Sequence, residues 1–159
     1  MATRTQPHRP QLRGLLHPAW GPLLRVELRG GDGRFTTGVA VIDTGAIMSA
    51  VDRAVAKELV MPSHGAATWF AVTSEADGPR SAAPLRRGQV KLGDDPRYWE
   101  MDFIEVPGLH DRVQGFRAVA LLGWDFLQNG QLSIDGPAGT WSLGLPPLPS
   151  RRRRTRRRR

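Results

Sequence analysis

Short apolar stretches separated by glycine- and proline-rich turns run along most of this 159-residue chain. Leu24, Val26 and Leu28 alternate with charged residues, a pattern typical of a strand with one buried face. Gly30–Gly33 then indicates a hairpin turn, and Phe35–Ile42 indicates a second strand. Because many such segments follow one another with closely spaced turn signals, the sequence predicts an all-β fold with one or two short helices.

The remaining elements are expected from the same kinds of pattern. Ser49 is expected to cap a helix whose apolar face carries Val51, Val55 and Leu59. A hairpin is expected over Thr68–Leu92, and a later short helix follows a buried strand. The expected segments are the first hairpin arm Trp69–Val72, the hairpin tip Asp77–Pro79, the strands Trp99–Phe103, Ala118–Leu122, Leu132–Asp135 and Thr140–Leu145, and the helix Trp124–Asn129.

Charge is distributed unevenly along the chain. Arg151–Arg159 contains eight arginines, which leaves 15 Lys and Arg to match the 15 Asp and Glu elsewhere. A block of like charges repels itself, so residues 147–159 are expected to form a disordered Pro- and Arg-rich tail. Two interpretations of this tail stay open. It either makes nonspecific contacts with nucleic acid or an acidic membrane surface, or it is a solubilising extension.

Length and composition limit the class of protein. The chain suffices for one domain, expected over residues 20–146, with residues 1–19 as a flexible N-terminal arm. No apolar run is long enough to span a bilayer, so no membrane span is expected. The absence of cysteine excludes disulfides and cysteine nucleophiles, and it favours a reducing, cytoplasmic setting.

One segment places an acidic residue directly after a buried strand. The apolar run Val39–Ile42 leads into Asp43, Thr44, Gly45 and Ala46. Burying a lone carboxylate is costly, so Asp43 should be hydrogen-bonded, paired or protonated. The same residue types are common in the turn that ends a strand. The segment alone therefore leaves both a functional site and a simple turn open.

A second segment, Ala120–Leu127, contains an apolar strand that ends at Gly123 and leads into a helix. Together the two segments resemble the retropepsin-like (retroviral-type) aspartic peptidases. In that family an Asp-Thr/Ser-Gly-Ala motif follows an apolar strand, and two apolar residues and a glycine later precede a helix. The resemblance covers about residues 20–146. It implies a retropepsin-like acid-protease barrel with one or two short helices.

The chain departs from the viral members of this family at positions near both segments. Ile47 and Met48 occupy places where many viral members carry acidic residues, and Trp124 replaces an arginine. Both ends of an ion pair are therefore absent together, and apolar packing is expected to replace it. The pattern is closer to that of bacterial or cellular members.

The resemblance implies an aspartic endopeptidase that hydrolyses peptide or protein substrates without a metal or organic cofactor. Two carboxylates that lie close together share one proton, so that one activates a water molecule and the other protonates the substrate carbonyl. This chain supplies one such residue, Asp43, so the resemblance implies a homodimer in which each protomer contributes its own Asp43.

The resemblance also implies roles for neighbouring residues. Thr44 would hydrogen-bond across the twofold axis, and Gly45 would let the backbone approach the two carboxylates. Ala46, together with Asp77 and Gly78 of the central hairpin, would contact the substrate.

The sequence also contains weaker candidates for a functional site. Asp135 is also followed by glycine, but it precedes Pro137 and is typical of a turn. The four histidines are isolated, so no metal site is predicted. Two alternatives remain: a catalytically inactive peptidase-fold binding module with a tail that contacts nucleic acid, and a sequence-independent nucleic-acid binder whose function lies in Arg151–Arg159.

Overall fold

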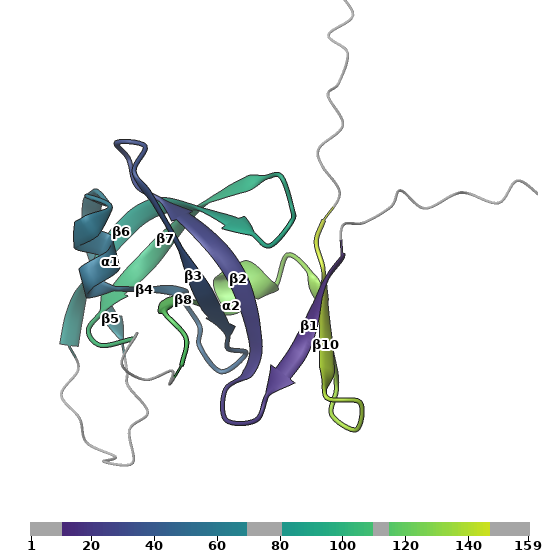
Figure 1. Ribbon diagram of the computed structural model, residues 1–159. Helices are drawn as coiled ribbons and strands as arrows, with labels where there is room; N and C mark the ends of the chain where they lie inside the picture. Colours follow the sequence, from purple (N-terminus) through teal and green to yellow (C-terminus); the bar gives the residue numbers. More distant parts are fainter. Residues whose placement is uncertain (1–10, 70–80, 110–114, 147–159) are drawn as a thin grey trace, which may run out of the picture.

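The structure is a computed structural model that describes residues 11–69, 81–109 and 115–146 (Figure 1). These residues form an all-β fold with two short helices, as the sequence predicts. In chain order the elements are β1 (Gln11–His17), β2 (Gly21–Arg29), β3 (Phe35–Ile42), β4 (Ala50–Asp52), α1 (Arg53–Glu58), β5 (Ser63–Trp69), β6 (Ser81–Leu92), β7 (Tyr98–Val106), β8 (Ala118–Leu122), α2 (Trp124–Leu127), β9 (Gln131–Asp135) and β10 (Thr140–Gly144).

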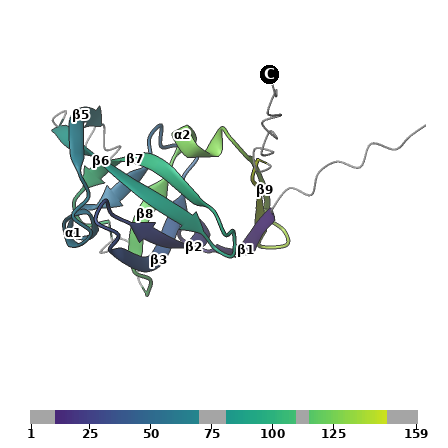
Figure 2. The ribbon, with the colours of Figure 1, turned by 90° about the horizontal axis from the view of Figure 1, so that it is seen from above.

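Six of these strands close into a ring. Their order is β6–β7–β4–β8–β3–β2, and β2 pairs again with β6. The pairings β3–β8 and β4–β7 are parallel, and the other four are antiparallel. Because the ring closes, each of its strands is hydrogen-bonded to a neighbour on both sides. β5 extends the sheet beyond β6, while β1, β10 and β9 extend it beyond β2 and lie beside the ring (Figures 1 and 2).

The loop that carries Asp43 lies between two hairpins in the chain order. An N-terminal hairpin, β2–β3, leads into the loop that carries Asp43, and a central hairpin, β5–β6, follows. The buried strand β8 then ends next to Gly123, α2 follows, and β9 and β10 close the domain.

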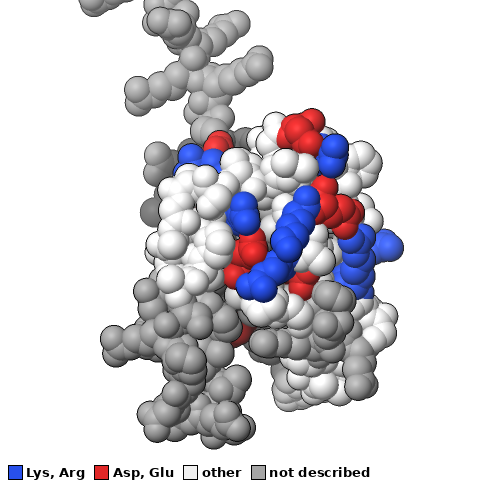
Figure 3. Space-filling view, turned by 90° about the vertical axis from the view of Figure 1, so that its left-hand side faces the viewer, with Lys and Arg blue, Asp and Glu red and all other residues white. Residues whose placement is uncertain are grey.

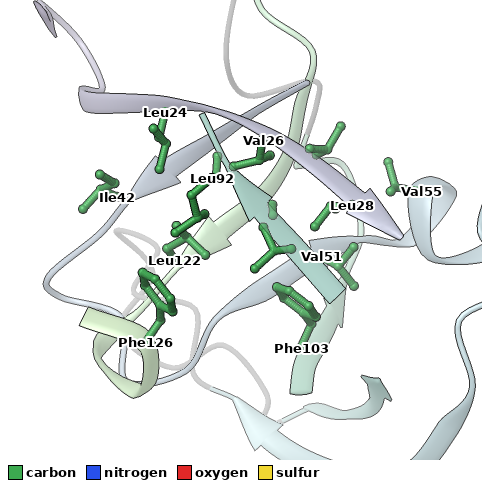
Figure 4. Packing of buried hydrophobic residues seen from close by; sticks show 14 of the residues in the cluster. Leu24, Val26, Leu28, Ile42, Val51, Val55, Leu92, Phe103, Leu122 and Phe126 are labelled. Carbon is green, nitrogen blue, oxygen red and sulfur yellow. The ribbon is translucent and has the colours of Figure 1, made fainter. Parts of the chain in front are cut away.

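The interior of the ring is filled with apolar side chains (Figure 4). Leu24, Val26 and Leu28 of β2 all point inward, which confirms the predicted alternation. From β3, Ala40 and Ile42 join the same core, whereas Val41 packs into a second cluster on the other side of the strand. The continuous apolar run of β3 is therefore buried on both faces, as the sequence predicts.

The first described residues of the chain differ from the expectation. Residues 11–17, expected in the flexible arm, form β1, which pairs with β10 in a register that sets Leu15 opposite Thr140 and also touches β2. The partner strand lies far away in the sequence, so no local pattern reveals the pairing. Residues 1–10 and the expected tail, 147–159, lie outside the described residues.

The first helix also begins later than expected. Ser49 does not cap it. Asp52 is the N-cap, and its carboxylate accepts hydrogen bonds from the amides of Ala54 (2.8 Å) and Val55 (3.4 Å). The reason is tertiary: residues 50–52 pair with β7 and β8 as a short strand, which moves the start of the helix to Arg53. Sheet pairing here overrides the local capping signal.

The first arm of the central hairpin, β5 (Ser63–Trp69), begins earlier than the expected start at Trp69. The rest of the expected arm, residues 70–72, lies outside the described residues. The expected tip of the hairpin, Asp77–Pro79, also lies outside the described residues.

Charged side chains around α1, β5 and β6 form ion pairs on one face, where positive and negative groups lie next to one another (Figure 3). The buried Glu105 carboxylate accepts hydrogen bonds from Arg53 (3.0 Å) and Arg86 (2.7 Å). Nearby, Asp102 pairs with Arg87 and His64, and the hydrogen bond from Arg87 holds the pKa of Asp102 below its usual value. These pairs join α1 and the central hairpin to β7.

A buried ion pair fastens the β6–β7 turn to the end of β10. Asp95 is 3% exposed and accepts hydrogen bonds from Arg97 (Nε at 2.8 Å), whose Nη1 also donates to the carbonyl of Pro146 (2.7 Å). Burial raises the pKa of Asp95, but hydrogen bonds and attraction from Arg97 outweigh burial and lower it below its usual value.

The path of the chain from β3 to β4 creates a close crossing. Because β8 lies between these two strands, residues 43–49 must pass over its end. Gly123 lies at this crossing. A Cβ atom there would lie 2.6 Å from the carbonyl carbon of Met48 and 2.9 Å from the carbonyl oxygen of Ala46. Both are backbone atoms, so the position has room only for glycine.

We expect Asp95→Asn to lower the free energy of unfolding by about 3 kcal/mol at neutral pH, because Arg97 loses a buried counter-charge. The carboxylate of Asp95 stabilises the fold above its ordinary pKa of about 4, and this contribution disappears as the pH falls through the lowered pKa of the folded state. The variant should therefore lose less stability on acidification. Urea unfolding at several pH values measures both effects, with the exposed neighbour Asp94→Asn as control. Equal acid sensitivity of variant and wild type would contradict this account.

We expect Gly123→Ala to lower the free energy of unfolding by about 1–3 kcal/mol, because the added methyl group forces the crossing loop away from β8. Gly136→Ala is the control, since a Cβ at that position meets no atom within 4 Å. Denaturant titration of both variants measures the difference. If Gly123→Ala is as stable as Gly136→Ala, the crossing is not as tight as described.

Candidate active site

Asp43 lies immediately after β3, where the chain leaves the sheet. Its amide donates a hydrogen bond to the carbonyl of Leu122 (3.0 Å), the last residue of β8. The parallel pairing of β3 with β8 therefore continues up to Asp43 itself. Its side chain is half-buried, at the end of the ring rather than inside it.

The residues after Asp43 form a tight turn. One carboxylate oxygen of Asp43, Oδ1, accepts a hydrogen bond from the amide of Gly45 (2.8 Å). The Asp43 carbonyl accepts a longer one from the amide of Ala46 (3.3 Å). A side chain at Gly45 would place its Cβ 3.2 Å from the same carboxylate oxygen. The turn thus fixes the carboxylate, and a residue without a side chain at position 45 leaves space beside it.

Helix α2 binds the next part of the loop through backbone groups. The amide of Trp124 donates to the carbonyl of Ala46 (2.8 Å), and the amide of Asp125 donates to the carbonyl of Ile47 (3.1 Å). These are amides of the first turn of a helix, which have no partner within the helix itself. The Asp43 loop and the segment after β8 are therefore joined directly. In the sequence alone, only the family resemblance relates these two segments to each other.

Ser49 provides a buried polar contact at the far end of the loop. Its hydroxyl accepts a hydrogen bond from the amide of Gly123 (3.0 Å) and donates one to Oδ1 of Asp125 (2.7 Å). The sequence pattern assigns Ser49 to a helix cap and places Asp125 in the expected helix Trp124–Asn129. Neither role points to the other residue, because 76 positions separate them. The signal that could reveal this contact is the complete burial of Ser49 close to the Asp43 motif. That burial is known only from the structure.

The structure brings together four of the six residues predicted for the site. Asp43, Thr44, Gly45 and Ala46 lie on one loop, and Thr44 and Gly45 are exposed. The other two, Asp77 and Gly78, lie outside the described residues. The roles of all six in catalysis or substrate binding stay predictions.

Within the described part of the chain, the amide of Gly45 is the one hydrogen-bond donor to the Asp43 side chain, and no second carboxylate pairs with it. Asp135, the other aspartate followed by glycine, accepts a hydrogen bond from the amide of Ala138 (3.0 Å) in the β9–β10 turn. Asp135 thus ends β9, and its side chain stabilises the turn that follows, in line with the turn predicted at this position. A two-carboxylate centre built on Asp43 therefore needs a carboxylate from outside these residues.

Two large apolar side chains next to the loop face solvent. Ile47 is 81% exposed and Trp124 is 56% exposed, and backbone hydrogen bonds join Ala46 and Ile47 of the loop to the segment that begins with Trp124. Many viral members of the family that the sequence resembles carry charged groups at these positions. Two exposed apolar side chains beside one loop mark a candidate contact surface.

A separate groove lies along the outer faces of β2 and β3. Its lining includes Leu23, Arg25 and Val39, together with His17 and Phe116, whose rings meet edge to face with centroids 5.6 Å apart. Asp43 is not among the lining residues. The groove therefore does not mark the Asp43 site.

Two further features concern only the described residues. No group of three or more His, Cys, Asp or Glu side chains there is placed to hold a metal ion. None of the helices described is long and apolar enough to cross a membrane.

Comparison with known proteins finds no matching protein-family model and no significantly similar curated protein. Among solved structures, the chain is similar to a retropepsin-like aspartic protease from Rickettsia conorii, with 17% sequence identity and a TM-score of 0.48 over 91% of this chain and 98% of that one. It is also similar to the retroviral protease-like domain of Ddi1 from Leishmania major, with 14% identity and a TM-score of 0.41 over 79% of this chain and 94% of that one. Both are of the retroviral-protease type that the two sequence segments resemble.

Proposed function

We propose that this protein is an aspartic endopeptidase that acts as a homodimer, with one Asp43 from each protomer at a twofold axis. The observation that carries the proposal is the construction of the Asp43 loop. A half-buried carboxylate is fixed by Gly45 at the end of a buried strand, and the loop is joined to the Gly123 segment through backbone hydrogen bonds.

The proposed chemistry follows from bringing two such carboxylates close together. Two neighbouring carboxylates share one proton, because ionising both is costly. The ionised Asp43 then removes a proton from a water molecule held between the two side chains, and that water attacks the carbon of the substrate amide. The protonated Asp43 of the other protomer donates its proton to the amide oxygen, which gives a gem-diol. The first Asp43 then gives the proton that it took from water to the amide nitrogen as the C–N bond breaks, and the other Asp43 takes a proton from a hydroxyl group as the carboxylic acid forms. No metal or organic cofactor takes part in these steps.

The proposed dimer gives a role to the exposed apolar side chains near the loop. If two copies of Asp43 meet at a twofold axis, the residues around the loop come close to the partner protomer as well. Ile47 lies four positions after Asp43, and Trp124 contacts the same loop through its backbone. We propose that these two side chains form part of the dimer contact, in place of charged groups.

We expect Asp43→Asn to reduce peptide-bond cleavage by at least about a hundredfold, because an amide cannot exchange the proton that the mechanism requires. The assay is mass-spectrometric detection of fragments from denatured protein substrates at several pH values. Asp32→Asn is the control, since Asp32 lies in the β2–β3 turn, where it accepts a hydrogen bond from the amide of Arg34 (3.0 Å). Equal cleavage by wild type and Asp43→Asn would eliminate the proposed mechanism. Binding of peptides without any cleavage would favour the inactive binding module instead.

We expect Ile47→Glu and Trp124→Ala each to weaken dimerisation by about tenfold or more, because burying a large apolar side chain contributes about 1.5–3 kcal/mol. Sedimentation across a range of protein concentrations measures the dissociation constant. Phe35→Glu is the matched control: Phe35 is 61% exposed, but it begins β3, at the opposite end of the strand from Asp43. Unchanged dimerisation in both site variants would remove this surface from the interface. An active monomer would contradict the shared pair of carboxylates.

A further inference from the structure

The side chain of Asp125 concentrates its hydrogen bonds on one oxygen. Its Oδ1 accepts from the amide of Ser49 (2.9 Å), the hydroxyl of Ser49 (2.7 Å) and the amide of Phe126 (2.9 Å). Two of the three donors belong to a residue 76 positions earlier in the chain. Hydrogen bonds to a charged acceptor are stronger than those between neutral groups. Asp125 therefore holds Ser49 more firmly than a neutral acceptor would.

Both the backbone amide and the hydroxyl group of Ser49 take part in this contact. It is 0% exposed, its amide and its hydroxyl both donate to Asp125, and its hydroxyl oxygen also accepts from the amide of Gly123. A buried hydroxyl that loses its partners costs about 1–3 kcal/mol, so the network resists local rearrangement. Through it, the last residue before β4 is attached to the junction of β8 and α2.

Together with the backbone contacts, this network restrains the whole Asp43 loop from one side. The segment after β8 binds the carbonyls of Ala46 and Ile47 through two amides, and it binds Ser49 through the Asp125 carboxylate. At the other end of the loop, the amide of Asp43 is bonded to β8 itself. The loop has no regular secondary structure between these points, so its shape depends on them.

Capping of α2 alone does not account for the Asp125 side chain. α2 spans four residues, and of the three hydrogen bonds to Oδ1 only that from Phe126 comes from the helix. The other two reach across to the loop. The carboxylate thus contributes more contacts to the loop than to its own helix.

We propose that Asp125 is a positioning residue for Asp43, acting through Ser49 to hold the loop in the geometry that lets two Asp43 carboxylates meet. This inference rests on the proposed function. Misplacing reacting groups by about 1 Å is enough to cost about a hundredfold in rate. Loss of the Asp125 carboxylate should therefore reduce the rate of the chemical step more than the binding of substrate.

The test compares the full-length variants Asp125→Ala, Asp125→Asn and Ser49→Ala with wild type in the cleavage assay. We expect Asp125→Ala to lower kcat by about 30- to 100-fold while KM changes by less than about threefold. Asp125→Asn keeps an oxygen that accepts all three hydrogen bonds, so it should recover activity to within about tenfold of wild type. Asp135→Ala, which removes an aspartate from an exposed turn, should leave kcat unchanged.

A second readout does not depend on activity. Hydrogen exchange of the Gly45 and Ala46 amides, both of which donate to Asp43, reports the order of the loop. These amides should exchange at least about tenfold faster in Asp125→Ala than in Asp135→Ala. If Asp125→Ala does not fold, the same measurements are made on Ser49→Ala and Asp125→Asn, for which we expect smaller effects.

The possible outcomes separate this inference from the proposed function. If wild type shows no cleavage that depends on Asp43, the proposed function fails, and hydrogen exchange alone decides whether Asp125 orders the loop. If cleavage depends on Asp43 but Asp125→Ala keeps kcat within about twofold of wild type, the positioning role is overturned. It is also overturned if Asp125→Asn is as impaired as Asp125→Ala, or if the loop amides exchange no faster.

Discussion

The passage of the chain from β3 to β4 over the end of β8 is the constraint on which the rest of the site depends. β8 pairs with β3 on one side and β4 on the other, so residues 43–49 have to cross at its end. The crossing brings the backbones of Ala46 and Met48 against Gly123. It also sets the carbonyls of the loop opposite the free amides of α2. One topological requirement thus fixes the glycine, the loop and the position of Asp43.

The closed ring makes this crossing rigid. Side chains of β2, β3, β6, β7 and β8 fill its interior, and at the Asp43 end of β3 the outward side chain of Val41 packs into a second cluster with Leu109 and Ala118. A strand packed on both faces and paired at both edges has little freedom to shift. Asp43 follows directly after such a strand, so its backbone position is determined by packing. Only the side chain and the loop beyond it need additional polar contacts.

Local patterns in the sequence predict the parts of the fold that local interactions determine. Alternation in β2 and the apolar run in β3 are read correctly, because burial of each residue follows from its place in its own strand. β1 and the N-cap at Asp52 are missed, because both depend on pairing with distant strands. The same limit applies to the site. Asp43 is identifiable from its position after an apolar run, whereas the contact between Ser49 and Asp125 exists only after folding.

A site assembled from two identical halves requires each half to be unusually well positioned. In the proposed dimer, a displacement of the Asp43 loop toward or away from the twofold axis occurs in both protomers, so the separation of the two carboxylates changes by about twice that displacement. Sharing one proton between them requires close contact, and a loop held only by apolar packing allows small sliding movements. Directional hydrogen bonds from a buried serine to a charged acceptor restrict such movements better, although burying polar groups costs desolvation. This gives a physical reason for a polar network at Ser49 and Asp125, at a place where the rest of the ring is packed with apolar side chains.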